Sequence, residues 1–288
     1  MRKKYKAIFF DWDGTAVMSR KAPVEKAVQA MRPLLTKGVK LAVISGTTYE
    51  NIAGGVIESY FTKEQLNHLY LGLGRGAYNY SFTDGKPVVF SHRIPDKAEL
   101  NKIHKICFDI HMELKNKYDY DTDIVFSRPN YCKIDLMVAN QRGDNLFMQS
   151  DELEGLRQCL KEHGVQGGLE TLISLSKETG KRYDTSVEAT CDAKYLEVGI
   201  SSKSNNVDDI FDLLHEKDGI QAEDCSFWGD EYVGIEKGIF GSDSFMRTLK
   251  TAGGDFFDVS QMQGERPEGV KQIGGGVDAF LKFLQEQV

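Results

Sequence analysis

The chain has 288 residues, 41% hydrophobic and 27% charged, which is the composition of a folded globular protein and not of a disordered or fibrous one. Its formal net charge of −7 disfavours general nucleic-acid binding, which requires a basic surface. No apolar run reaches the roughly 18 residues that a membrane span needs, and a chain of this length favours two domains.

The N-terminus and the cysteines indicate the compartment. The start, MRKKYKAIFF, is basic like a signal peptide, but Asp11 and Asp13 interrupt the apolar stretch within a few residues. The five cysteines are odd in number, scattered and never in a CxxC pair, so the sequence predicts neither a disulfide framework nor a zinc site. We therefore expect a cytoplasmic protein with no membrane or nucleic-acid partner.

A strand, a helix and a second strand are predicted in chain order at the beginning of the sequence. Residues 5–10 form a short apolar run that ends in polar residues, which is typical of a buried strand. Apolar residues then recur at three- and four-residue steps from Val24 to Leu35, and Gly38 follows where a helix cap is expected. Residues 41–44 are again continuously apolar. This spacing predicts a parallel βαβ unit.

The same pattern returns near the other end of the chain. We expect a helix over residues 207–214, strands over 225–228 and 244–248, and a closing helix over 277–284. Between the two ends, residues 84–196 change to alternating strands, such as 88–92 and 131–138, with helices near 96–116 and 151–163. The two ends therefore predict one α/β layer, and the middle predicts a separate α+β insert.

The strongest chemical signal is the segment Asp11-Trp12-Asp13-Gly14-Thr15, directly after the first predicted strand. In open parallel sheets, ligands bind outside the carboxyl ends of the strands. Two buried carboxylates are costly there unless a cation or hydrogen bonds offset their charge. We interpret Asp11 as a nucleophile that forms an aspartyl-phosphate. Asp13 would then be the general acid to the leaving oxygen and afterwards the base for water. An ordinary acidic turn is the structural alternative.

Three further segments complete the predicted site. Ser45-Gly46-Thr47 ends the second strand, where a hydroxyl and free N–H groups can hold phosphate oxygens. Lys203 precedes a helix and could neutralise both the phosphate and Asp11. Trp228-Gly229-Asp230-Glu231 ends the strand 225–228 and supplies the oxygen ligands that Mg²⁺ prefers.

These four segments, in this order, resemble the four motifs of the haloacid dehalogenase superfamily. The chain is most similar to the Cof-type branch (subfamily IIB), whose entry and exit sequences around the cap resemble Leu73-Gly74-Arg75-Gly76-Ala77 and Leu196-Glu197-Val198. The second acid of the first motif implies phosphoryl transfer and not dehalogenation.

The resemblance implies an α/β fold, with a Rossmann-like parallel-sheet core in residues 1–83 and 197–288 and an α+β cap in residues 84–196. It implies a Mg²⁺-dependent phosphatase, active as a monomer or homodimer on a small phosphorylated metabolite, with a sugar phosphate as the expected substrate. The catalytic residues would be Asp11, Asp13 and Lys203. The phosphate would be bound by Ser45, Gly46 and Lys203. The metal would be bound by Asp11, Asp13, Asp230 and Glu231.

The fourth motif departs from the family pattern. A second carboxylate usually follows the first by four or five positions, but Gly234 and Ile235 stand there. Glu231 is the nearest substitute in the sequence and Asp243 a more distant one. Asp11, the Asp13 carbonyl and Asp230 are therefore the firmer metal ligands.

Two other functions use the same residues. A phosphomutase would keep the phosphate on the enzyme while the sugar reorients, and steady release of phosphate without an activating bisphosphate would exclude it. A catalytically silent binding module is suggested by the irregular fourth motif, but both Asp11 and Asp13 are present. Within the insert, strand alternation places Lys133 and Asp135 on one face, either to bind hydroxyl groups or as an ordinary solvated surface.

Overall fold

The computed structural model describes residues 3–139 and 150–288, and the chain divides into two compact units. The core unit comprises Met1–His92, Lys203–Val233 and Asp243–Val288, and the insert unit comprises Arg93–Ser202 and Gly234–Ser242. The division expected from the sequence differs in detail, since it assigns residues 84–92 to the insert and residues 197–202 and 234–242 to the core.

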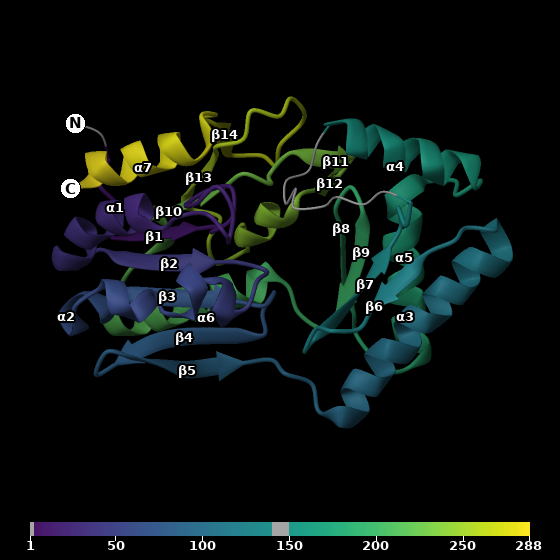
Figure 1. The fold of residues 1–288 in the computed structure, drawn as a ribbon, viewed down its shortest axis with the longest axis horizontal. Coiled ribbons are helices and arrows are strands. Elements are labelled where there is room, and N and C mark those ends of the chain that lie inside the picture. Colours follow the sequence, from purple (N-terminus) through teal and green to yellow (C-terminus); the bar gives the residue numbers. More distant parts are fainter. Residues whose placement is uncertain (1–2, 140–149) are drawn as a thin grey trace. The chain divides into compact units, whose positions relative to one another are not determined.

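The core unit is built on a sheet that, within the described residues, has eight strands (Figure 1). In spatial order they are β14 (Val270–Gln272), β13 (Asp255–Asp258), β10 (Cys225–Gly229), β1 (Ala7–Phe10), β2 (Lys40–Ile44), β3 (Leu69–Leu73), β4 (Tyr78–Thr83) and β5 (Lys86–His92). All neighbouring pairs from β14 to β3 are parallel, whereas β4 and β5 are antiparallel additions. The loops after β1, β2 and β10 therefore emerge at one edge of the sheet.

Helices cover both faces of this sheet. They are α1 (Glu25–Thr36), α2 (Lys63–Leu66), α6 (Lys203–Asp218) and α7 (Gly276–Gln287). Because successive side chains of a strand point to opposite faces, β1 contributes to two cores. Ile8 and Phe10 belong to the core with α1 and α7, and Ala7 and Phe9 belong to the core with α6. This two-sided burial explains the continuously apolar sequence of the strand.

The insert unit has an antiparallel sheet of its own and three helices among its described residues. The sheet order is β6 (Asp123–Val125), β7 (Tyr131–Asp135), β9 (Tyr195–Gly199) and β8 (Glu188–Cys191). The helices are α3 (Lys97–Tyr118), α4 (Ser150–Glu162) and α5 (Gly168–Arg182). A short hairpin of β11 (Gly234–Glu236) and β12 (Ile239–Phe240) also belongs to this unit.

The predicted α/β fold with an α+β insert is confirmed, and two predicted details are wrong. Residues 244–248 do not form a strand, because they lie in the 3₁₀ helix η5 (Ser242–Met246) and the turn after it. The strand expected at residues 88–92 exists but pairs with β4, so it belongs to the core sheet. Nothing in a short apolar run distinguishes a sheet-edge strand from a strand of the neighbouring unit.

Within residues 3–139 and 150–288, no helix is both long enough and apolar enough to cross a bilayer.

The packing of α7 predicts a measurable contribution to stability. Phe280 is fully buried, with its ring centroid 4.9 Å from Phe10 and 5.6 Å from Trp228. We expect Phe280→Ala to lower the free energy of unfolding of the core unit by about 3–5 kcal/mol, because a buried ring leaves a cavity. Both tryptophans of the chain, Trp12 and Trp228, lie in the core unit, so their fluorescence during urea denaturation reports on it selectively.

The exposed Lys282 on the same helix provides the control. Lys282→Ala should change stability by no more than about 0.5 kcal/mol. A loss below about 1 kcal/mol for Phe280→Ala would show that α7 does not hold the sheet as described.

Candidate active site

Asp11 lies directly after β1 and is almost completely buried. Its backbone N–H donates to the Trp228 carbonyl of β10 over 2.9 Å, which extends the sheet ladder by one step. The side chain accepts a hydrogen bond of 2.8 Å at Oδ1 from Lys203 Nζ. The nucleophile expected from the sequence and the predicted lysine are thus in direct contact.

Lys203, the first residue of α6, bridges two carboxylates. Its Nζ lies 2.8 Å from Asp11 Oδ1 and 2.8 Å from Asp243 Oδ1, and all three side chains are buried. Burial alone lowers the pKa of Lys203, but the carboxylates of Asp11 and Asp243 outweigh it and raise that pKa well above its usual value. The two carboxylates therefore favour the charged form of the Lys203 side chain.

Asp243, in η5, binds the fourth predicted segment through its second oxygen. Its Oδ2 accepts hydrogen bonds from the backbone N–H groups of Asp230, at 3.0 Å, and Glu231, at 2.8 Å. Its own N–H donates to the Glu231 carbonyl over 3.2 Å. Asp243 is fully buried and connects the loop after β10 to Lys203. The sequence offers Glu231 and Asp243 as substitutes for the second acid of the fourth motif. Of these two, Asp243 is the one whose side chain contacts Lys203 and the N–H groups of residues 230 and 231.

Asp230 completes a cluster of acids beside Lys203. Its Oδ1 accepts a hydrogen bond of 3.1 Å from Thr15 Oγ1, which ties the first predicted segment to the fourth. Burial and the charges of Asp243, Asp11 and Glu231 raise the pKa of Asp230 well above its usual value. Burial likewise raises the pKa of Asp11, which Lys203 opposes and Asp243 reinforces. The cluster therefore contains more carboxyl groups than Lys203 alone can neutralise.

Asp13 lies on the loop after Asp11, and its partner is Arg20. Arg20 Nη2 is 3.1 Å from Asp13 Oδ2. Burial raises the pKa of Asp13, while Arg20 and Lys203 oppose the rise. A carboxyl group with a raised pKa holds its proton more readily, as a general acid must.

The predicted phosphate loop follows β2, the strand next to β1. The Thr47 N–H donates to Ser45 Oγ over 3.3 Å, and the Ser45 N–H donates to the Gly72 carbonyl of β3 over 2.9 Å. A side chain at Gly46 would lie 3.5 Å from Arg75 Cγ, so the loop packs against the β3–β4 turn. Ser45 and Gly46 thus lie at the same sheet edge as Asp11. These two residues contact their own loop, β3 and the β3–β4 turn.

Several buried polar atoms that have no hydrogen-bond partner among the described residues also follow the strand ends at this edge. They include Trp12 Nε1, Asp13 Oδ1, Thr47 Oγ1, Tyr232 Oη and Ser260 Oγ. All five follow the carboxyl ends of β1, β2, β10 or β13. A buried polar group without a partner costs free energy, so this concentration indicates a place where a ligand or water supplies the missing bonds.

The acids at this edge suit Mg²⁺. Within the described residues, no group of three or more His, Cys, Asp and Glu side chains is arranged so that it could hold a metal ion by itself. Mg²⁺, however, is usually held by one or two carboxylates together with waters and substrate phosphate. Asp11, which is buried, and Asp230, which is half-buried, are the two carboxylates that could supply such a partial ligand set. The Asp13 carbonyl and Glu231 remain predicted ligands.

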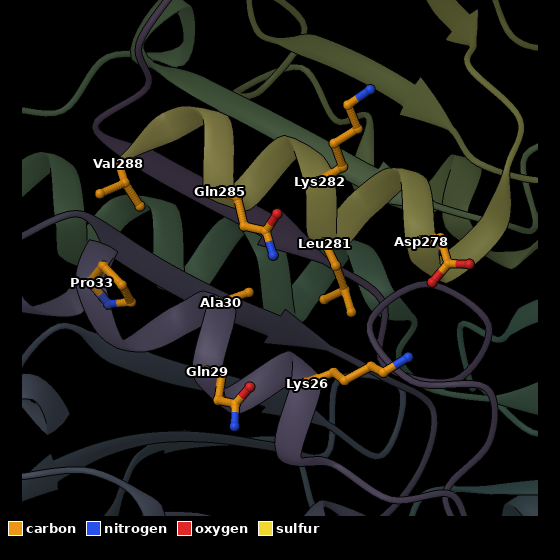
Figure 2. A pocket seen from close by; sticks show the side chains of 9 residues that line it. All are labelled: Lys26, Gln29, Ala30, Pro33, Asp278, Leu281, Lys282, Gln285 and Val288. Atoms are coloured by element: carbon orange, nitrogen blue, oxygen red, sulfur yellow. The ribbon is translucent and has the colours of Figure 1, made fainter.

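A separate cavity of about 640 Å³ lies elsewhere in the core unit, between α1 and α7. Figure 2 shows Leu281 and Gln285 reaching from α7 toward α1. None of the predicted site residues lines it. Its lining residues belong to α1, α7 and the residue after α7, whereas the acids and Lys203 lie at the strand ends.

Lys133 and Asp135, the two polar residues that the sequence singled out in the insert, each form an ion pair with another residue of the insert. Lys133 Nζ is 2.8 Å from Glu197 Oε1, and Asp135 Oδ2 is 3.0 Å from Lys194 Nζ. The Asn130 side chain donates to Ser201 Oγ over 2.9 Å. These pairs give one face of the insert sheet a charged but locally neutral surface.

Comparisons with solved structures identify the fold. The chain superposes on an IMP-bound, N-terminally truncated IMP-nucleotidase of Plasmodium falciparum with a TM-score of 0.61 and 14% identity, over 99% of this chain and 68% of the other. It superposes on the sucrose-phosphatase of Synechocystis sp. PCC6803, bound to sucrose and phosphate, with a TM-score of 0.54 and 13% identity, over 99% and 98%. A protein of Eubacterium rectale gives a TM-score of 0.55 and 12% identity, over 99% of both chains.

The likeness to these proteins was found by comparison of structures and not of sequences. No protein-family model matches the chain, and no curated protein sequence is significantly similar to it. The structural likeness extends over nearly the whole chain and includes the mainly parallel sheet that carries the acids. The chain therefore has the haloacid dehalogenase-like fold that its motifs predicted.

Proposed function

We propose that the chain is a Mg²⁺-dependent phosphatase that hydrolyses a small phosphorylated metabolite, specifically a sugar phosphate, through an aspartyl-phosphate on Asp11. The observation that carries this proposal is the buried Asp11 carboxylate at a strand end, 2.8 Å from Lys203 and in one cluster with Asp230 and Asp243. The fold shared with an IMP-nucleotidase and a sucrose-phosphatase supports it.

The first half of the reaction transfers the phosphoryl group to the protein. An Asp11 oxygen attacks phosphorus, the bond between phosphorus and the ester oxygen breaks, and the leaving oxygen takes a proton from Asp13. Lys203 holds Asp11 Oδ1, so the carboxylate presents Oδ2 as the attacking atom. The ammonium also lies where negative charge accumulates as the phosphate approaches.

The second half returns the protein to its starting state. Asp13, now ionised, takes a proton from a water molecule whose oxygen attacks phosphorus, and the bond to Asp11 breaks. Inorganic phosphate leaves and Asp13 is protonated again. When bound, Mg²⁺ would reduce the repulsion between Asp11 and the phosphate dianion.

The phosphate and the group that carries it are assigned to different parts of the chain. Ser45, Gly46 and Lys203 would bind the phosphate oxygens. We propose that the insert is a cap that recognises the sugar. Paired cations and carboxylates on its sheet, such as Lys133 and Glu197, would bind the sugar hydroxyl groups. A sugar phosphate also forms part of IMP, which binds one of the structural neighbours.

Substitution of the nucleophile tests the reaction. Asp11→Asn should abolish Mg²⁺-dependent release of phosphate from p-nitrophenyl phosphate and from a panel of sugar phosphates and nucleoside monophosphates, because an amide cannot form the aspartyl-phosphate. Phosphate release is measured in the steady state without an activating bisphosphate. Steady release by the unchanged protein under this condition would also exclude a phosphomutase. Asp84→Asn, the same chemical change in an exposed turn, should retain the rate of the unchanged protein. An active Asp11→Asn variant would contradict the proposal.

The Asp243 contacts predict a second effect. Asp243→Asn should lower kcat/KM by about 10- to 100-fold, because the amide places a donor against either Lys203 or the N–H groups of residues 230 and 231. Glu231→Gln is the matched comparison, since Glu231 is the other substitute for the missing acid. A larger loss for Glu231→Gln than for Asp243→Asn would assign the missing acid to Glu231.

The third prediction concerns the metal. Activity should disappear when Mg²⁺ is removed with EDTA and return when Mg²⁺ is added back. Asp230→Asn should raise the Mg²⁺ concentration needed for half-maximal activity, because it removes one of the two carboxylates proposed to bind the metal. The rate is measured across a Mg²⁺ titration. Equal Mg²⁺ dependence in the variant and the unchanged protein would exclude Asp230 as a ligand.

A further inference from the structure

The loop after Asp13 is folded back on itself and fixed to the core. Gly14 has φ of 88°, in the region that glycine adopts readily, and its N–H donates to the Val17 carbonyl over 2.7 Å. The N–H groups of Ala16 and Val17 both donate to the Trp12 carbonyl over 3.0 Å. Because the side chains of residues 12, 16 and 17 are buried in the main core, this turn has one defined conformation.

The returning loop brings Arg20 to Asp13. A tight turn follows, in which the Ala22 N–H donates to the Ser19 carbonyl over 2.8 Å. Arg20 Nη2 lies 3.1 Å from Asp13 Oδ2, and the side chains are 33% and 12% exposed. The contact is partly buried, so solvent screens it less than an ordinary surface ion pair.

The two oxygens of Asp13 therefore differ. Oδ2 is held by Arg20, whereas Oδ1 is buried and has no protein partner among the described residues. A planar guanidinium fixes the orientation of a carboxyl group more strictly than a lysine ammonium does. The contact thus selects which oxygen is available to exchange a proton.

We propose that Arg20 is a positioning residue that holds Asp13 Oδ2, so that Oδ1 delivers the proton to the leaving oxygen and later accepts one from water. This inference rests on the proposed phosphatase reaction. Arg20 cannot itself donate the proton, because its guanidinium stays protonated up to a pH above about 12. Its contribution therefore passes entirely through Asp13.

A second role for an arginine at this place would be direct binding of the substrate phosphate. The two roles differ in their dependence on the leaving group. Phenolate is a strongly basic leaving group and needs the acid, whereas 2,4-dinitrophenolate leaves without a proton. Both esters carry the same phosphate, so a lost phosphate contact would slow both equally.

The experiment compares kcat/KM for phenyl phosphate and 2,4-dinitrophenyl phosphate at saturating Mg²⁺, in the full-length protein. Arg20→Gln should lower kcat/KM for phenyl phosphate on the order of 10- to 100-fold, as misplacement of a catalytic group does, and leave that for the dinitrophenyl ester nearly unchanged. Asp13→Asn should show the same selectivity with a larger loss, roughly 10²- to 10⁴-fold. Arg20→Lys should restore part of the rate on phenyl phosphate.

The ratio of the two rates is taken within one preparation, so it does not depend on the fraction of folded protein. Lys21→Gln, which removes a positive charge from the next position, is the matched control and should leave the ratio unchanged. Equal losses on both esters for Arg20→Gln, with Asp11→Asn inactive, would overturn the role of Arg20 alone. An active Asp11→Asn variant would overturn the phosphatase reaction, and this inference with it.

Discussion

The structure depends above all on holding several carboxylates at one buried sheet edge with few positive charges. Asp11, Asp230 and Asp243 surround Lys203, and isolated buried charges of this kind are strongly unfavourable. Hydrogen bonds offset this unfavourable free energy. Lys203 donates to both Asp11 and Asp243, and two backbone N–H groups donate to Asp243. Any negative charge that remains would attract a divalent cation, and without a cation it would repel a phosphate dianion. Charge balance thus makes the metal part of the proposed chemistry.

Much of the core could be predicted because its pattern is local. Strands buried on both faces, such as β1, are continuously apolar, and a helix packed on one face repeats every three or four residues. Parallel strand order then brings the residues after β1, β2 and β10 to one edge. The motif Asp11 to Thr15 could be found for the same reason, since a polar, acidic turn that follows a buried strand is unusual.

The remaining features of the fold and the site depend on contacts between residues that are far apart in the sequence. A local sequence pattern does not contain that information. The pairing of Arg20 with Asp13 requires the turn that Gly14 allows, and the bond from Thr15 to Asp230 joins residues 215 positions apart. The strand expected at residues 88–92 was assigned to the wrong part of the chain, because its partner β4 is determined by a hairpin and not by composition. Side-chain pairing across long separations is a property of the folded chain.

Asp243 shows what the irregular fourth motif means physically. The Asp243 carboxylate accepts the N–H groups of residues 230 and 231 and contacts Lys203, although it lies 12 positions after Glu231 in the sequence. The hairpin of β11 and β12 lengthens the chain between the two acids, and its own anchors are local to the insert unit: Glu236 accepts the Leu169 N–H at 2.9 Å. An insertion changes the spacing of a motif while leaving its contacts in place, because loop length costs little free energy once both ends are fixed. We therefore interpret Asp243 as the carboxylate that the fourth motif lacks at its usual position, since it makes the contacts with Lys203 and with residues 230 and 231.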